Sequence, residues 1–291
     1  MQPLHISNEW KQELHEYLRG LSGAFLLGIP LLYTMEMWWI GEYLATSHLL
    51  SLLGFALLIN YALASVGGFR RSKPILGNLE EALDAVAIGA VGSLLVLAVL
   101  NRISWHEPFE SNLGMLVLQT VPLSIGASVS NILFARVADE DNGDDEPRSH
   151  QHHRAKNSTV WQRTLTDIGA TIAGAVIIGF SIAPTEEIPM LANELGWLHE
   201  LSLIAISLII TYAIVFASGF DPQGEMQDHG IFQHPASETT ISYIVSLGLS
   251  FVMLMLFDQV SLDNPLSNTV SQVLVLGLPT AIGGAAGRVA I

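Results

Sequence analysis

The sequence contains no cysteine, which excludes disulfide bonds, thiolate metal sites and cysteine nucleophiles. Charged residues are also scarce: they make up 13% of the 291 residues, where an ordinary globular chain has about a quarter. The lysines are Lys11, Lys73 and Lys156, and all of them lie in polar segments. A retinal-type Schiff base inside a membrane bundle is therefore excluded.

Motifs of the common enzyme classes are missing as well. The chain has no His-Glu-x-x-His zinc motif, phosphate-binding loop, dinucleotide fingerprint or nucleophile elbow, so we do not expect an enzyme. The formal net charge of −15 argues against nucleic acid as a partner, because nucleic-acid-binding surfaces are basic. Residues 2–16 are polar and acidic, and we expect no signal peptide there.

Long apolar runs are what the chain does have. Half of its residues are hydrophobic, and they are concentrated in runs of about 20 residues, the length at which a helix crosses a bilayer. The pattern predicts an all-α transmembrane fold, an eight-helix bundle. The predicted spans are residues 20–41, 49–69, 81–101, 113–134, 165–185, 201–220, 240–257 and 269–287. Residues 1–19 carry a partial apolar stripe, which predicts either a helix lying on the membrane surface or an extension of the first span.

The two halves of the chain resemble each other. Residues 28–69 align with residues 179–220 without a gap, and residues 81–126 align with residues 238–283. Several identical positions are polar, so shared hydrophobicity alone does not explain the match. We predict two homologous four-helix repeats, residues 20–136 and 161–291, joined by a linker at residues 137–160. An even number of helices gives both repeats the same, parallel orientation, related by a pseudo-two-fold axis along the membrane normal.

The distribution of basic residues predicts the topology. With a cytoplasmic N-terminus, every Lys and Arg except Arg102 falls on the inner side, and this bias sets orientation. We expect a protein integral to the cell (inner) membrane with both termini cytoplasmic. The linker is acidic and His-rich, and its composition indicates disorder. His150, His152 and His153 could bind a transition metal loosely, although a solvated spacer is the simpler interpretation.

The candidate site comes from ionisable residues inside membrane-length runs, which are costly and therefore functional candidates. Glu36 and Glu187 occupy aligned positions and would face one another across the repeat axis. Carboxylate and hydroxyl oxygens suit hard cations. The predicted cation ligands are Glu36, Glu187, Thr34, Thr185, Glu186 and Asp258. The alternative is that the two glutamates are interfacial carboxylates that reach water beside Trp38 and Trp39.

These residues lead to a functional hypothesis. We expect a cation transporter or channel, proton-coupled or for a divalent ion, with the repeat interface as its pathway. The alternative is a non-transporting membrane scaffold or sensor that acts through the cytoplasmic linker. A bound metal cation is the one cofactor these residues could hold. The expected partners are the lipid bilayer and a cation or proton, with a homo-oligomer as a further possibility.

Three segments carry a family resemblance: Tyr-Thr-Met-Glu-Met-Trp at residues 33–38, Gly-Gly-Phe-Arg-Arg-Ser-Lys at residues 67–73, and the acidic linker. Together they resemble a prokaryotic family of integral membrane proteins with no assigned activity. The resemblance would cover nearly the whole chain. It implies a membrane protein and adds no mechanism.

Overall fold

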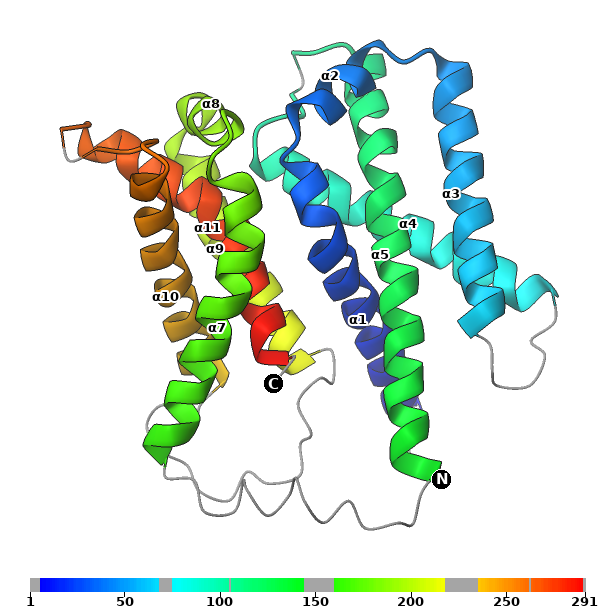
Figure 1. The fold of residues 1–291 in the computed structure, drawn as a ribbon. Coiled ribbons are helices and arrows are strands. Elements are labelled where there is room, and N and C mark those ends of the chain that lie inside the picture. Colours follow the sequence, from blue (N-terminus) through cyan, green and yellow to red (C-terminus); the bar gives the residue numbers. More distant parts are fainter. Residues whose placement is uncertain are drawn as a thin grey trace.

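The computed structural model describes residues 6–67, 75–104, 106–143, 160–217, 235–261 and 263–289. Within these ranges every regular element is a helix (Figure 1). The elements are α1 (Ile6–Leu32), α2 (Met35–Tyr43), α3 (Thr46–Gly67), α4 (Ile75–Val99), α5 (Phe109–Gly143), α7 (Val160–Ile182), α8 (Glu187–Glu194), α9 (Trp197–Tyr212), the π-helical turn η1 (Ala213–Ala217), α10 (Pro235–Leu256) and α11 (Leu266–Val289).

The described residues contain six helices that are long and apolar enough to cross a membrane, or up to eight spans if each bent pair counts as one. The bent pairs are α1 with α2 and α7 with α8, whose axes turn by 86° and 89°. The sequence analysis predicted helical spans at residues 20–41 and 165–185. A single helix over 20–41 was wrong, whereas the second helix ends close to its predicted boundary. Each of these spans ends at the break, at Leu32 or Ile182, and the chain then turns sideways.

The first break lies at Thr34. This residue is extended (φ −95°, ψ 115°), and its hydroxyl donates to the Pro30 carbonyl at 3.1 Å. The hydroxyl thus takes the place of the backbone amide that a continuing helix would supply. At the second break the Thr185 hydroxyl donates to the Ile182 carbonyl at 2.7 Å, and Pro184 has no N–H to donate.

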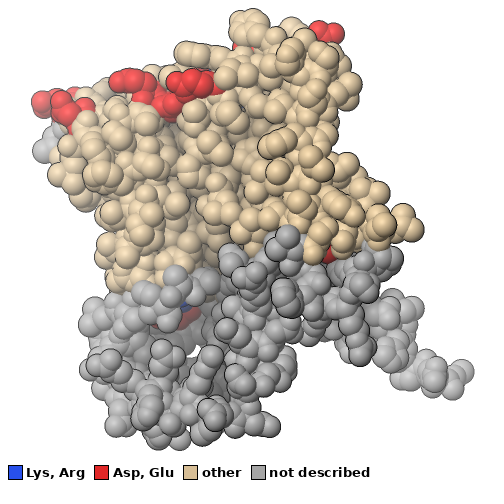
Figure 2. All heavy atoms as spheres, turned by 45° about the vertical axis from the view of Figure 1, so that its right-hand side comes forward, with Lys and Arg blue, Asp and Glu red and all other residues tan. Residues whose placement is uncertain are grey.

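The short helices that follow the two breaks lie at the same end of the molecule. The start of α1 and the end of α11 lie at one end of the molecule, and α2 and α8 lie at the other (Figure 1). Carboxylate side chains gather along the α2 and α8 end (Figure 2). The exposed ones there include Glu36, Glu107, Glu110, Glu186, Glu194, Asp258 and Asp263.

The predictions for residues 1–19 and for the linker have different outcomes. α1 continues without a break from Ile6 into the first span, so residues 6–19 and that span form one helix. The His-rich part of the linker, with His150, His152 and His153, lies outside the described residues. The metal-binding prediction for those histidines stays a prediction.

Candidate functional site

The candidate site lies where the two bent spans meet. Glu187 is the first residue of α8, and its side chain is 9% exposed. Its Oε1 accepts the backbone N–H of Met35, the first residue of α2, at 3.3 Å. A carboxylate from the second half therefore sits against the N-terminus of a helix in the first half. The partial positive charge of a helix N-terminus stabilises a carboxylate in this position.

The aligned residue Glu36 has a different environment. It is exposed, as is Glu186, the residue that precedes α8. Asp258 is exposed as well and follows α10 in a left-handed backbone conformation (φ 58°). Of the four predicted carboxylate ligands, only Glu187 is buried. Among the described residues no group of three or more His, Asp and Glu side chains could hold a metal ion.

The two predicted threonine ligands lie at the breaks themselves. Both hydroxyls donate their hydrogen to backbone carbonyls, Thr34 to Pro30 and Thr185 to Ile182. Their oxygen lone pairs keep acceptor capacity. A cation next to Glu187 would therefore have to complete its coordination with threonine oxygens, backbone carbonyls and water.

A charged contact that sequence reasoning missed joins the halves nearby. The Arg102 Nη1 donates to Glu194 Oε2 at 2.7 Å, and its guanidinium carbon lies 4.7 Å from the centroid of the Trp38 ring. Arg102 follows α4 in the first half, whereas Glu194 ends α8 in the second. The available signal was the charge pattern, because Arg102 is the one basic residue predicted on the outer side.

The alternative interpretation of the sequence placed Trp38 and Trp39 together at the water interface. Trp39 is 51% exposed, but Trp38 is fully buried. The Trp38 indole N–H donates to the Leu32 carbonyl at 2.9 Å. Trp38 therefore closes the turn between α1 and α2, and only Trp39 has the exposure of an anchor.

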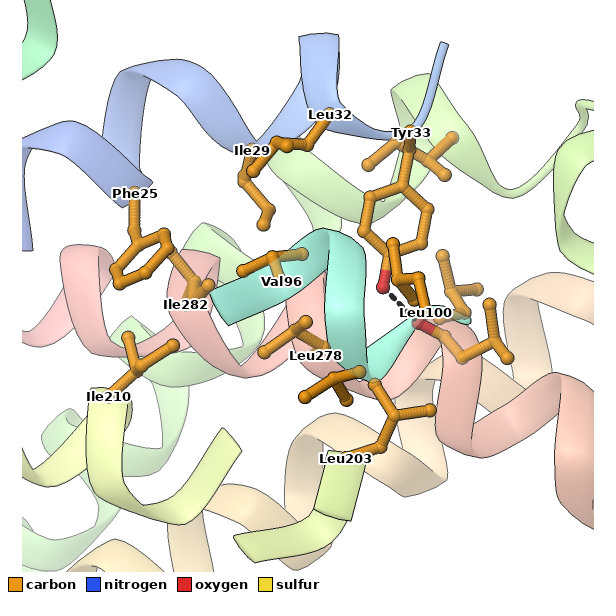
Figure 3. Close-up of a cluster of buried hydrophobic side chains, with 14 of the residues drawn as sticks. Phe25, Ile29, Leu32, Tyr33, Val96, Leu100, Leu203, Ile210, Leu278 and Ile282 are labelled. Atoms are coloured by element: carbon orange, nitrogen blue, oxygen red, sulfur yellow. Dashed lines mark hydrogen bonds between the residues drawn. The ribbon is translucent and has the colours of Figure 1, made fainter. Parts of the chain in front are cut away.

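Below the junction the contact between the halves is apolar. Figure 3 shows side chains from α1, α4, α9 and α11 packed together at the centre of the molecule. Those that it labels are Phe25, Ile29, Leu32, Tyr33, Val96, Leu100, Leu203, Ile210, Leu278 and Ile282, and all are buried. The one polar tip in this group, the Tyr33 hydroxyl, donates to the Val275 carbonyl at 2.8 Å.

The described part of the chain has only helices as regular elements, and several of them are apolar and of membrane length, which is the pattern of a polytopic integral membrane protein. A family model described as "Putative integral membrane protein (DUF2391)" matches residues 16–291. The chain belongs to this family, and the resemblance noted from the sequence is confirmed. Comparison with curated proteins and with solved structures gives no match.

Proposed function

We propose that this membrane protein carries a cation or proton, as a transporter or channel, and that Glu187 is the ionisable group that binds it. The observation that supports this is the burial of Glu187 beside a break in two spans. Glu187 is buried, and the hydrogen bond that its Oε1 accepts from the Met35 amide is long, at 3.3 Å. A carboxylate can accept several partners, so a cation can bind beside this amide.

We further propose that the two halves are parallel repeats. The support is local geometry at aligned positions. Asn101 and Asp258 are the two non-glycine residues with positive φ in the described chain, at 55° and 58°. The amide that follows each of them bonds back to a carbonyl at the end of the preceding helix, Arg102 to Leu97 and Gln259 to Leu254. The matching bends of 86° and 89° add to this support.

A second candidate function also has an observation in its favour. The apolar contact between the halves, shown in Figure 3, is what a non-transporting scaffold or sensor would have at its centre. In that case Glu187 would serve to join the halves through the Met35 amide. The two candidates make different predictions for ion flux and for the effect of neutralising Glu187.

The decisive experiment compares Glu187→Gln with Glu186→Gln in proteoliposomes. Ion movement is followed with Na⁺, K⁺, Mg²⁺, Ca²⁺ and proton gradients of defined size. We expect Glu187→Gln to abolish the flux that the unmodified protein supports, and Glu186→Gln to keep it, because Glu186 is exposed. Both variants should elute at the position of the unmodified protein in size-exclusion chromatography, which shows that they are folded. Unchanged flux in Glu187→Gln, or no flux of any of these ions in the unmodified protein, would favour the scaffold.

A further inference from the structure

Polar residues line the interior of the second half at positions where the first half is apolar. Ser207 on α9 aligns with Ala56, and Ser242 on α10 aligns with Ala85. Thr280 on α11 aligns with Leu123. All three polar residues are buried. The two halves therefore differ in polarity at positions inside the protein, and contact with lipid or solvent does not explain the polar side chains.

The inner end of this polar region is a pocket between α7, α10 and α11. It is open to the surface and has a cavity volume of about 40 Å³. Charged and hydroxyl side chains line it, including Asp167, Thr171, Glu238, Ser242 and Arg288. Arg288 donates to Glu238 Oε2 at 3.1 Å. The pocket lies at the end of the molecule where α7 and α10 begin and α11 ends (Figure 1).

Hydroxyl groups continue from the pocket into the bundle. The Thr171 and Ser242 hydroxyls are 3.4 Å apart. One turn further along α10, the Ser246 hydroxyl donates to the Ser242 carbonyl at 2.9 Å. After another turn the Ser250 hydroxyl lies 2.8 Å from that of Thr280 on α11. Each of these residues is at most 5% exposed, so the ladder is enclosed by protein.

Beside this ladder, three further buried hydroxyls make no hydrogen bond of ordinary geometry within the described residues, although those of Ser207 and Tyr243 lie close enough to interact with each other. They belong to Ser207 and Thr211 on α9 and to Tyr243 on α10, which are 0%, 0% and 4% exposed. Tyr243 shares a helix face with Ser246 and Ser250, which follow it by three and seven positions. Buried hydroxyls without partners are costly, and buried water commonly satisfies such groups.

Polar groups also reach toward the outer end. The Gln272 Oε1 atom on α11 is buried and has no hydrogen-bond partner in the described part of the chain. Its neighbour Ser271 donates a short hydrogen bond to the Glu200 carboxylate near the start of α9. Glu200 aligns with Leu49 and Gln272 aligns with Met115, so the first half has apolar side chains at both places.

The corresponding level of the first half is closed by direct contact. Gly89 aligns with Ser246, and a Cβ atom on Gly89 would fall 2.6 Å from the Ser124 amide nitrogen. The polar residue of α3, Asn60, donates to Ser124 at 2.9 Å and accepts from Ser128 at 2.8 Å. The Asn60 side-chain amide is thus hydrogen-bonded by protein groups, and it needs no water partner.

We propose that the second half contains a hydrated proton pathway, in which water joins the hydroxyls of α9, α10 and α11 between Glu200 and the pocket at Glu238 and Asp167. The pathway rests on the proposed ion-carrying function and names its ion. It also places the route inside one half, away from the apolar contact between the halves.

The chemistry of the lining favours a proton over a metal ion. A hydroxyl or a water molecule can accept a proton on one side while it donates another on the opposite side. The chain of groups therefore moves one proton inward without keeping a charge. A carboxylate at each end can take up and release that proton. A metal ion would need several carboxylate or imidazole ligands, and no such cluster occurs within the described residues.

Single cysteines test the hydration of this region, and the cysteine-free chain provides a clean background. Ser207→Cys is compared with Ala56→Cys, its aligned and equally buried counterpart in the first half. Both are exposed in proteoliposomes to 2-aminoethyl methanethiosulfonate, which reacts with a hydrated thiolate. We expect modification of Ser207→Cys and none of Ala56→Cys, measured by intact-protein mass. Equal modification, or none in either variant, overturns the pathway.

A measurement of proton flux tests whether the transported ion is a proton. A Ser207→Ala, Tyr243→Phe double variant removes two hydroxyls with little change in volume, and Ser93→Ala is the matched control from the first half. With a pH-sensitive dye inside proteoliposomes, we expect the double variant to lose proton flux and Ser93→Ala to keep it. Absence of proton flux in the unmodified protein, or retained flux in the double variant, overturns the inference. Loss of flux in Glu187→Gln with intact Ser207→Cys labelling would separate the Glu187 site from this pathway.

Discussion

Gly126 on α5 lies in direct backbone contact with Gly23 on α1: a Cβ atom on Gly126 would fall 2.6 Å from the Gly23 carbonyl oxygen. In the second half Gly283 on α11 meets Gly174 on α7 in the same way, with the corresponding distance at 2.5 Å. Small residues let helices approach closely in lipid, where helix packing has no hydrophobic driving force. The first and last helices of each half are therefore held together at glycine contacts.

A methyl group at this contact should destabilise the fold. We expect Gly126→Ala to lower the free energy of unfolding in detergent by roughly 1–3 kcal/mol, because the added carbon forces the backbones apart. Gly54→Ala is the control, since a Cβ atom there meets nothing within 4 Å. Equal thermal unfolding midpoints for the two variants would show that the helices separate without cost.

The ion pair between Arg102 and Glu194 should contribute measurable but small coupling. Glu194 is 43% exposed, so solvent weakens the attraction. In a double-mutant cycle with Arg102→Gln and Glu194→Gln, we expect a coupling energy of about 0.5–1 kcal/mol that falls as salt is added. The measurement is denaturant unfolding in detergent. A coupling that does not change with salt would point to packing of Arg102 on Trp38 as the source of its effect.

The left-handed conformation of Asp258 gives a test that separates backbone strain from ion binding. Glycine adopts φ near 58° without cost, whereas alanine is disfavoured there by about 1–2 kcal/mol. We expect Asp258→Gly to keep the stability of the unmodified protein and Asp258→Ala to lower it in a thermal unfolding assay. If Asp258 is a cation ligand as predicted, both variants lose cation-dependent stabilisation. If only the alanine variant is affected, the role of Asp258 is confined to the turn.

Topology is tested by impermeant thiol labelling of single cysteines on the cysteine-free chain. Following the basic-residue bias, we expect cysteines at Ser47, Ser111 and Asn264 to react from outside in intact cells. Cysteines at Ser149 and Gln223 should react only after the membrane is opened. Labelling of Ser149 from outside would reverse the proposed orientation.

The placement of the spans could be predicted from the sequence because it depends on the length of apolar runs. The break at Thr34 could not, because the apolar run continues through Trp38 and Ile40, and Thr34 and Glu36 within it do not by themselves mark a helix end. At the break the Thr34 hydroxyl takes the place of a backbone amide at Pro30. The exchange of a backbone hydrogen bond for a side-chain one depends on local geometry, which the pattern of hydrophobic residues does not predict.

The candidate site was predicted in part. The sequence identified Glu187 but treated Glu36 as its equal, and the structure makes one buried and the other exposed. Alignment of the halves directs attention to what they share. The polar residues of the second half are found by the opposite comparison, at positions such as Ser207 and Ala56 where the halves differ. Their significance depends on burial, which needs the fold.

The bent spans also determine how the molecule fits its bilayer. α1 has 27 residues and α7 has 23, so each is about 35–40 Å long at 1.5 Å per residue and exceeds a typical hydrocarbon core of about 30 Å. The axes of α2 and α8 turn by 86° and 89° from these helices. When α1 and α7 cross the bilayer, α2 and α8 therefore lie along one of its faces, and lipids there meet helices that run parallel to the membrane surface.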